Sequence, residues 1–149
     1  MREEGIDNLE VHVDGICFDG DNVLIGKRSL VRKIYPGLWA GGGGQVRKGE
    51  NFEEAITRQL KQEFRVIAKP IRVLGVYEIQ TPSSDQKKIP GVKFLCEIES
   101  FVNGEGPVIN EEFDEWRWQP INKIDELDFI PGLKEHIKRA HSLFKSIKK

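Results

Sequence analysis

The sequence predicts an α/β protein, an α/β/α sandwich in which helices cover both sides of a mixed β-sheet. The prediction rests on the order of elements along the chain, because strand-like apolar segments occur throughout and two segments have helical apolar spacing. With 149 residues and 38% hydrophobic composition, the chain is long enough to bury a core as one soluble domain over residues 1–149.

Composition and charge argue against several classes of function. The net charge of −1 gives no reason to expect a nucleic-acid or membrane partner. No apolar run reaches membrane-spanning length, and the acidic amino terminus MREEGIDN is unlike a secretory signal, so a cytoplasmic location is expected. Cys17 and Cys96 stand singly in distant apolar segments, which predicts buried core thiols rather than a metal site or a disulfide.

The first strands form a predicted hairpin. Residues 9–18, LEVHVDGICF, alternate apolar and polar positions, and turn residues at 19–22 lead into a second strand at 23–25. His12 has the opposite parity from the valines, and no second His or Cys is spaced to join it. This favours a surface or hydrogen-bonded histidine over a metal ligand.

Four consecutive glycines, Gly41 to Gly44, are expected to form a site-making loop. Without a Cβ atom, glycine adopts positive φ readily and lets a ligand approach its backbone amide. After Gly49 the pattern becomes that of an amphipathic helix over residues 51–65. The apolar stripe of this helix comprises Phe52, Ala55, Ile56, Leu60 and Phe64.

Three more strands and a second helix are predicted beyond residue 70. The strands cover 71–79, 92–98 and 115–119, and a polar loop at 81–90 joins the first two. Trp116 and Trp118 share one face of the last strand, which favours core packing over base stacking. A final helix follows Pro131, with an apolar stripe of Leu133, Ile137, Ala140, Phe144 and Ile147.

The central segment resembles the sequence box of the Nudix hydrolase family. That box has a glycine, five residues, a glutamate, seven residues, and then Arg-Glu-apolar-any-Glu-Glu-any-Gly-apolar. Six residues of this chain fall on it in register: Gly44, Glu50, Arg58, Leu60, Glu63 and Val66. The resemblance implies a Nudix-like α/β/α sandwich with a mixed β-sheet.

Two carboxylates of the box are missing. In the family, three helix glutamates hold divalent cations against a bound diphosphate, whereas this chain has Gln59, Gln62 and Glu63 there. Their spacing of i, i+3 and i+4 places them on one helix face. An amide oxygen ligates a hard cation but brings no negative charge, and it does not act as a general base.

The closing glycine of the box is also replaced, by Arg65. Two outcomes follow from this replacement. Either Arg65 adopts the left-handed conformation, at a cost on the order of 1 kcal/mol, or the helix ends differently, with Pro70 as a later stop.

The resemblance implies Mg²⁺ or Mn²⁺ as cofactor. The predicted metal ligands are Glu63, Glu50, Gln59 and Gln62. The predicted catalytic residues are Glu63, Arg58 and Glu112. The helix charges alone suggest an exposed Glu54–Arg58 pair, whereas the family implies that Arg58 orients Glu50 or Glu63.

The remaining predicted site residues bind the substrate or supply a further carboxylate. Arg28, Gly43 and Gly44 are the predicted substrate-binding residues. Arg28 is preferred to Arg32 and Lys33, because in Nudix-like chains an arginine near the end of this strand often faces the phosphates. In several branches a late-loop glutamate supplies the base or a metal ligand, which points to Glu111 or Glu112.

The sequence therefore predicts a Nudix-type pyrophosphohydrolase. Its partner would be a small nucleotide or phosphate compound, a nucleoside diphosphate linked to another group, and a metal-assisted water would attack phosphorus. Activity is expected to be weak because of Gln59 and Gln62. A non-catalytic regulatory domain that binds a nucleotide or phosphate compound is the first alternative, and a scaffold that keeps only the fold is the second. A homodimer is left open.

Overall fold

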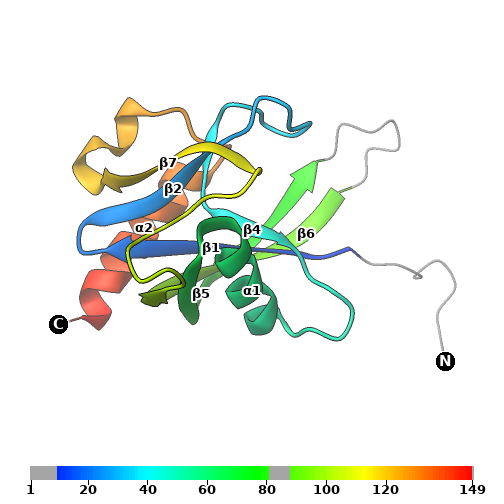
Figure 1. Ribbon diagram of the computed structural model, residues 1–149, viewed down its shortest axis with the longest axis horizontal. Helices are drawn as coiled ribbons and strands as arrows, with labels where there is room; N and C mark the ends of the chain where they lie inside the picture. The colour runs from blue at the N-terminus through cyan, green and yellow to red at the C-terminus, as the bar shows by residue number, and fades with distance from the viewer. Residues whose placement is uncertain (1–9, 81–87, 149) are drawn as a thin grey trace, which may run out of the picture.

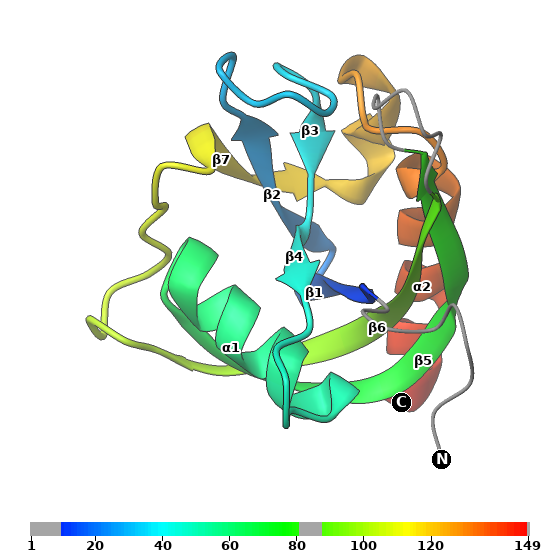
Figure 2. The ribbon, with the colours of Figure 1, turned by 90° about the vertical axis from the view of Figure 1, so that its right-hand side faces the viewer.

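The computed structural model describes residues 10–80 and 88–148, and these form a curved mixed sheet with a helix on each side (Figures 1 and 2). The α/β/α sandwich predicted from the sequence is confirmed. The strands are β1 (His12–Asp19), β2 (Asn22–Arg28), β3 (Trp39–Ala40), β4 (Gly42–Gln45), β5 (Val66–Gln80), β6 (Lys88–Phe101) and β7 (Phe113–Pro120). The helices are α1 (Phe52–Phe64), α2 (Leu133–Ile147) and the 3-10 segment η1 (Ile121–Glu126).

The sheet is mixed because β1 and β6 run parallel while the other pairs within the described residues are antiparallel. Strand order is β3-β2-β1-β6-β5, with β7 also paired to β2. The predicted hairpin of β1 and β2 is confirmed, with Phe18 opposite Val23. The first half of β1 pairs instead with β4, so the glycine run lies beside His12 to Gly15.

Side-chain alternation along the central strands divides the core between the two helices. Val13 and Cys17 of β1 belong to the cluster that packs against α1, whereas Ile16 and Phe18 pack against α2. Cys17 and Cys96, far apart in sequence, are opposite each other in the β1–β6 register. Both are buried free thiols, as expected.

Helix α1 begins and ends with well-defined caps. Asn51 and Glu54 form a capping box, so Glu54 caps the helix and the exposed Glu54–Arg58 pair is not what the structure contains. Arg65 adopts φ 56° and ψ 37°, which is the left-handed cap that the sequence left open. The apolar stripe is buried except for Phe52, whose side chain lies at the first turn and is exposed.

Several predicted boundaries differ from the structure. Strand β5 starts at Val66, directly after Arg65, so Pro70 lies in a strand at an irregular step of the β5–β6 ladder and does not stop the helix. Pro90 belongs to β6 rather than to a loop. Leu9 and most of the predicted loop 81–90, residues 81–87, lie outside the described residues.

The glycine run is not the loop that the sequence suggested. Residues 42–45 form β4, and Gly41 to Gly44 are absent from the residues with positive φ. Their function in the fold is close packing, because each added Cβ would lie within 3 Å of a neighbouring atom. Within residues 10–80 and 88–148, no helix has the length and hydropathy needed to span a bilayer.

Candidate functional site

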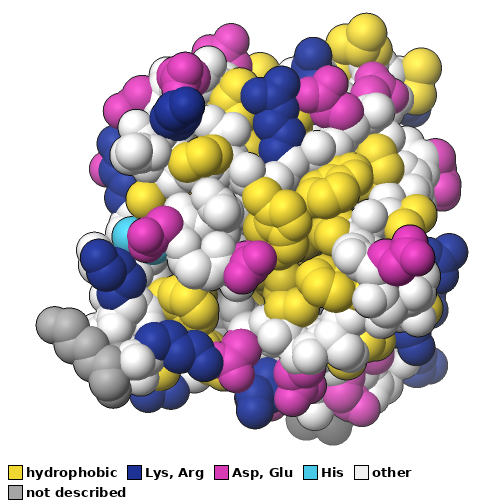
Figure 3. Space-filling model, turned by 60° about the vertical axis from the view of Figure 1, so that its left-hand side comes forward, with side chains coloured by type: hydrophobic (Ala, Val, Ile, Leu, Met, Phe, Trp, Pro, Cys, Tyr) yellow, Lys and Arg dark blue, Asp and Glu magenta, His cyan; other side chains and the backbone are white. Residues whose placement is uncertain are grey.

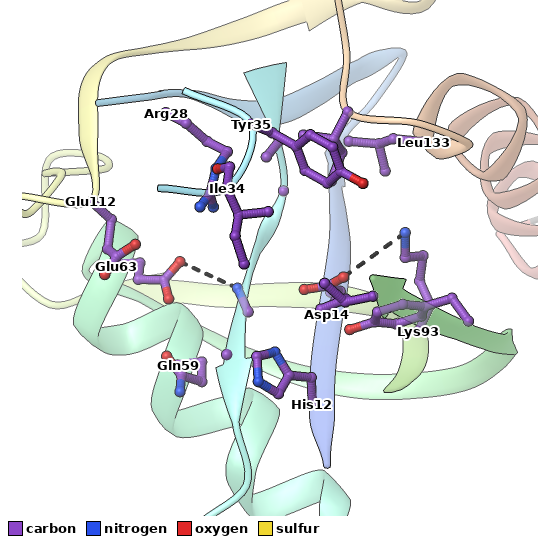
Figure 4. Close-up of a pocket in the computed structure, with 18 of the residues that line it drawn as sticks. His12, Asp14, Arg28, Ile34, Tyr35, Gln59, Glu63, Lys93, Glu112 and Leu133 are labelled. Carbon is purple, nitrogen blue, oxygen red and sulfur yellow. Dashed lines mark hydrogen bonds and ion pairs between the residues drawn. The ribbon is translucent and has the colours of Figure 1, made fainter. Parts of the chain in front are cut away.

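A cavity of about 500 Å³ lies over the part of the sheet where β1 pairs with β4 (Figure 4). One end lies beside α1 and is lined by Gln59 and Glu63, with Glu112 next to Glu63 and Arg28 above them in the figure. The other end lies beside the start of α2. Of the predicted site residues, the structure brings six to this cavity: Arg28, Gly43, Gly44, Gln59, Glu63 and Glu112.

Glu63 is the carboxylate that α1 presents to this cavity, and its residue is only 5% exposed. The N–H of Gly43 donates to Glu63 Oε1 at 3.2 Å. When the Gln59 amide is oriented to satisfy both of its ends, it donates to Glu63 Oε2 at 2.9 Å and accepts from Arg58 at 3.2 Å. Burial raises the pKa of Glu63 well above 4.5, and the neighbouring Glu112 and Asp14 raise it further.

Gly43 and Gly44 are required because a side chain at either position would clash with neighbouring atoms, not because their φ angles are positive. A Cβ at Gly43 would lie 2.0 Å from Asp14 Oδ1 and 2.2 Å from the Val13 carbonyl oxygen. A Cβ at Gly44 would lie 2.5 Å from Gln59 Nε2. Only glycine lets β4 approach both β1 and α1 this closely.

Arg28 enters the cavity from the end of β2 and is held in place by the following loop. Its Nε donates to the Ile34 carbonyl oxygen at 2.9 Å, and its two terminal nitrogens form no hydrogen bond within the described residues. Burial and the nearby Arg32 lower the pKa of Arg28, while Glu112 and Glu63 oppose that shift. A guanidinium whose two terminal nitrogens are both free is suited to bidentate binding of a phosphate.

Of the two late-loop glutamates, Glu112 lines the cavity and Glu111 is exposed elsewhere. Glu112 Oε1 lies 3.1 Å from Arg32 Nη1, and its backbone oxygen accepts from the Ser29 N–H. These contacts attach the late loop to the segment after β2. Glu112 is therefore a second cavity carboxylate.

Arg58 braces Glu50, which is one of the two partners that the resemblance implied. Its Nε and Nη2 contact the two carboxylate oxygens of Glu50 at 2.6 and 2.9 Å, and Nη2 also donates to the Gln45 carbonyl oxygen. Nη1 donates to Gln62 Oε1 at 3.2 Å. Glu50, Arg58 and Gln62 do not line the cavity, so the four predicted metal ligands are divided between two places.

This Arg58–Glu50 pair predicts a pH-dependent stability. The hydrogen bonds from Arg58 are the main cause that lowers the pKa of Glu50 from 4.5 to about 2. The stabilisation is complete above pH 4.5 and is lost as pH falls toward 2. Because solvent reaches the pair, Glu50→Gln should lower the free energy of unfolding at pH 7 by only about 1 kcal/mol.

The check is denaturant unfolding of parent and Glu50→Gln at pH 7 and pH 3. The difference between the two proteins should shrink at pH 3. Glu53→Gln, an exposed change three residues later in the first turn of α1, is the matched control and should show no such loss. A difference for Glu50→Gln that is the same at both pH values would contradict the pairing.

The α2 end of the cavity contains residues that sequence reasoning missed. Asp14 of β1, Tyr77 of β5, Lys93 of β6 and His136 of α2 all line it. Lys93 is 4% exposed, and its Nζ lies 3.9 Å from Asp14 Oδ2 and 5.0 Å from the centre of the Tyr77 ring. The one available signal was a lysine at the second position of the apolar strand VKFLCEI. His12, expected at the surface or hydrogen-bonded, also lines the cavity, and its Nε2 lies 3.2 Å from Glu10 Oε2.

Burial dominates the electrostatics of this end. It raises the pKa of Asp14 and lowers the pKa of Lys93, and each of the two groups opposes the shift of the other. Burial, followed by Lys93 and Arg139, lowers the pKa of His136. Burial and Asp14 raise the pKa of Tyr77. The α2 end thus places a buried acid, Asp14, beside a buried base, Lys93, with the side chains of Tyr77 and His136 near them.

A second hollow lies away from this cavity and is shallow and open. Its volume is about 440 Å³, and Trp116 and Trp118 lie on its wall while also packing against the α1-side core. Their rings meet edge to face, with centroids 6.3 Å apart. Figure 3 shows that hydrophobic side chains gather on one face of the surface. The hollow contains no cluster of charged groups comparable to that of the first cavity.

The donor set at the α1 end fits a metal that arrives with phosphate ligands. Across residues 10–80 and 88–148 there is no group of three or more His, Cys, Asp or Glu that could enclose a metal ion. Mg²⁺, however, commonly binds through one or two carboxylates and completes its shell with substrate phosphates and water. Glu63 and Glu112 offer such a partial set. Gln59 adds its amide oxygen only when its side chain turns that oxygen from Arg58 toward Glu63.

The NUDIX domain family model matches residues 8–140 of this chain. An ADP-ribose pyrophosphatase from Methanocaldococcus jannaschii is 30% identical over 120 residues, covering 80% of this chain and 66% of that protein. The chain therefore spans just under two thirds of that relative's length. Nucleoside triphosphatase NudI from Klebsiella pneumoniae is 28% identical over 111 residues, covering 70% of this chain and 77% of that protein.

Solved structures share the fold at lower identity. The NUDIX domain of Shewanella oneidensis NrtR, complexed with ADP ribose, has a TM-score of 0.74 at 17% identity, over 97% of this chain and 94% of that one. A NUDIX hydrolase from Nitrosomonas europaea has a TM-score of 0.72 at 17% identity, over 91% and 90% of the two chains. These likenesses concern architecture alone.

Proposed function

Because the chain belongs to the Nudix hydrolase family, we propose that it hydrolyses a nucleoside diphosphate linked to another group. Family membership, predicted from the spacing of Gly44 to Val66, is confirmed, and the names of the curated relatives support the pyrophosphohydrolase class. The relatives named ADP-ribose pyrophosphatase and nucleoside triphosphatase NudI support nucleotides as the substrate class. In the proposed reaction, water attacks one phosphorus of the diphosphate and releases a phosphorylated product on each side of the broken bond.

One observation carries the proposal: Glu63 is buried in the same cavity as Arg28. A carboxylate is costly to bury. The Glu63 carboxylate is buried, accepts a hydrogen bond from the Gly43 N–H, and shares the cavity with the Arg28 guanidinium (Figure 4). Such an acid–cation arrangement in a cleft is a typical setting for phosphate chemistry. The Glu50–Arg58 pair, by contrast, braces the loop before α1 from outside.

Each cavity residue has a proposed task. Arg28 binds the diphosphate with its free guanidinium edges and offsets charge that develops in the transition state. Glu112 accepts the proton of the attacking water, for which it must lie within hydrogen-bond reach of that water in the complex. Gly43 and Gly44 keep the floor of the cavity open, while Arg58 acts as a positioning residue through Glu50 and the Gln45 carbonyl oxygen.

We assign the metal requirement to Glu63. Glu63 would hold Mg²⁺ or Mn²⁺ once the diphosphate is bound, joined by the Gln59 oxygen after the amide turns from Arg58 toward Glu63. A divalent ion supplies charge neutralisation and polarises the phosphate oxygens when it is present. With few protein carboxylates, affinity for the free ion should be low, so the activity should be weak.

A second candidate function is nucleotide binding without turnover, as a regulatory domain. It is favoured by the same replacements, since Gln59 and Gln62 remove two of the family's negative charges from α1. Arg28 and the open cavity would serve binding equally well under this reading. The two candidates differ in whether substrate is consumed.

A paired screen separates the candidates. Thermal unfolding and product release are measured for nucleoside diphosphate derivatives, including ADP-ribose, each with Mg²⁺, Mn²⁺ or chelator. A hydrolase gives metal-dependent release of a nucleoside monophosphate from at least one compound. Stabilisation by a ligand without product release, at high protein concentration and long incubation, would leave only the binding function. Neither effect with any compound would leave only a scaffold.

A further inference from the structure

The α2 end of the cavity has a polar pair that the phosphate chemistry at the α1 end does not use. Lys93 and Asp14 project from the adjacent parallel strands β6 and β1, where they are opposite each other in register. Lys93 Nζ and Asp14 Oδ2 are 3.9 Å apart, which is too far for a hydrogen bond. Both side chains line the cavity (Figure 4). The pair brings one donor group and one acceptor group with no net charge.

Polar atoms around this pair lack partners. Lys93 Nζ forms no hydrogen bond within the described residues, although it offers three donors and the residue is 4% exposed. Among the described residues, His136 Nδ1 is buried with no hydrogen-bond partner, and Tyr77 Oη is buried with the neighbouring Asp14 carboxylate as its one polar contact. Native structures rarely leave several buried polar groups unmet in one place. A ligand with a hydrogen-bond donor beside an acceptor would form hydrogen bonds with these polar groups.

The walls at this end are largely apolar. Ile34 and Tyr35, from the loop after β2, close one side, and Ile130 and Leu133, before and at the start of α2, close another. Figure 4 places Tyr35 and Leu133 above Asp14 and Lys93. A ligand that suits this end would be flat and apolar, to contact the walls, and would have one polar edge, to meet the donor and the acceptor. A sugar or a second phosphate would leave these apolar walls unused.

We propose that Asp14 and Lys93 recognise the edge of the substrate's nucleobase, with Lys93 donating to a ring nitrogen or carbonyl oxygen and Asp14 accepting from the adjacent N–H. This inference rests on the proposed function, which places the diphosphate at the Arg28 and Glu63 end of the same cavity. A nucleobase presents such an adjacent donor and acceptor on its edge. Ligand hydrogen bonds would also replace the hydration that both charged groups lose on burial.

The test is binding without turnover. Calorimetry in chelator measures AMP, GMP and UMP against ribose 5-phosphate, which keeps the sugar and phosphate but has no base. At least one nucleotide should bind about tenfold or more tightly than ribose 5-phosphate, as expected for a good bidentate contact to a base edge. Ribose 5-phosphate binding as tightly as the best nucleotide would overturn the proposal.

Four variants locate the effect. Lys93→Met and Asp14→Asn should each reduce the advantage of the preferred nucleotide about tenfold or more while leaving ribose 5-phosphate unchanged. The double variant Asp14→Asn, Lys93→Met leaves no lone buried charge, so it should fold where a single variant does not and should also lose the advantage. Lys69→Met, an exposed lysine change on β5, is the matched control and should bind like the parent. Folded variants that keep the full advantage would overturn the proposal.

A further arm needs no variant. Methylation of the base nitrogen that donates to Asp14 should weaken binding to the parent about tenfold or more. The methylated nitrogen has no N–H from which Asp14 could accept a hydrogen bond. Unchanged binding of the methylated nucleotide would contradict the assignment of Asp14. These measurements require no hydrolysis. A chain that selects bases through Asp14 and Lys93 but never releases product would refute the hydrolase and leave this subsite standing.

Discussion

Glu63→Gln should reduce metal-dependent turnover by several hundred-fold or more, the usual loss when a key metal-binding or acid–base group is removed. Glu63 is the carboxylate that α1 places in the cavity, and a glutamine in its place would keep the shape of the side chain while removing its charge. The measurement is the initial rate of product release at saturating Mg²⁺ for the two proteins. Equal rates would show that the site lies elsewhere.

The same substitution should not weaken the fold in chelator. Burial raises the pKa of Glu63, so the folded state loses stability as pH rises from 4.5 through the raised pKa. A neutral glutamine has no such penalty, and its oxygen still accepts from the Gly43 N–H. Glu63→Gln should therefore unfold at the same temperature as the parent or higher at pH 7, which separates lost chemistry from lost structure.

Gly43→Ala should have the largest effect on stability, a loss of about 3 kcal/mol. The new Cβ would lie 2.2 Å from the Val13 carbonyl oxygen and 2.9 Å from the Asp14 Cα, which are backbone atoms of the paired strand. Backbone atoms in a ladder have no rotamer to move into, so β4 must separate from β1. Denaturant unfolding at pH 7 measures the loss.

Gly44→Ala is the matched comparison, one residue along the same strand. Its Cβ would meet the end of the Gln59 side chain at 2.5 Å, and that flexible amide can turn away. The loss should be about 1 kcal/mol, and Gln59→Ala in the same chain should remove most of it. Equal losses for Gly43→Ala and Gly44→Ala would contradict the close approach of β4 to β1.

Local sequence patterns predicted the parts of this fold that depend on local spacing. The hairpin of β1 and β2, the helix α1 and its register with Glu63 on the cavity side all follow from periodicity and the box. The glycine run did not, because four glycines fit both a positive-φ loop and a strand that packs tightly. What decides between them is the proximity of Val13, Asp14, Leu60 and Gln59, which belongs to the tertiary structure.

The candidate site was predictable at one end only. Glu63, Arg28 and Glu112 carry a family pattern, whereas Asp14 and Lys93 meet only because β1 and β6 pair in parallel across nearly eighty residues. No spacing rule anticipates such a register. The division of the predicted metal ligands has a similar origin, since Arg58 draws Glu50 and Gln62 away from the cavity through contacts with three partners.

The most direct test of the proposed hydrolysis measures metal-dependent product release by Gln59→Glu, by Gln62→Glu and by the parent. It asks whether the small number of α1 carboxylates in the cavity limits the proposed activity. Gln59 lines the cavity beside Glu63, whereas Gln62 contacts Arg58 outside it. Gln59→Glu should be less stable than the parent in chelator, regain stability with Mg²⁺, and release product about tenfold or more faster. Gln62→Glu should match the parent. A Gln59→Glu variant that shows neither Mg²⁺-dependent stabilisation nor faster release would contradict a metal-assisted site at Glu63.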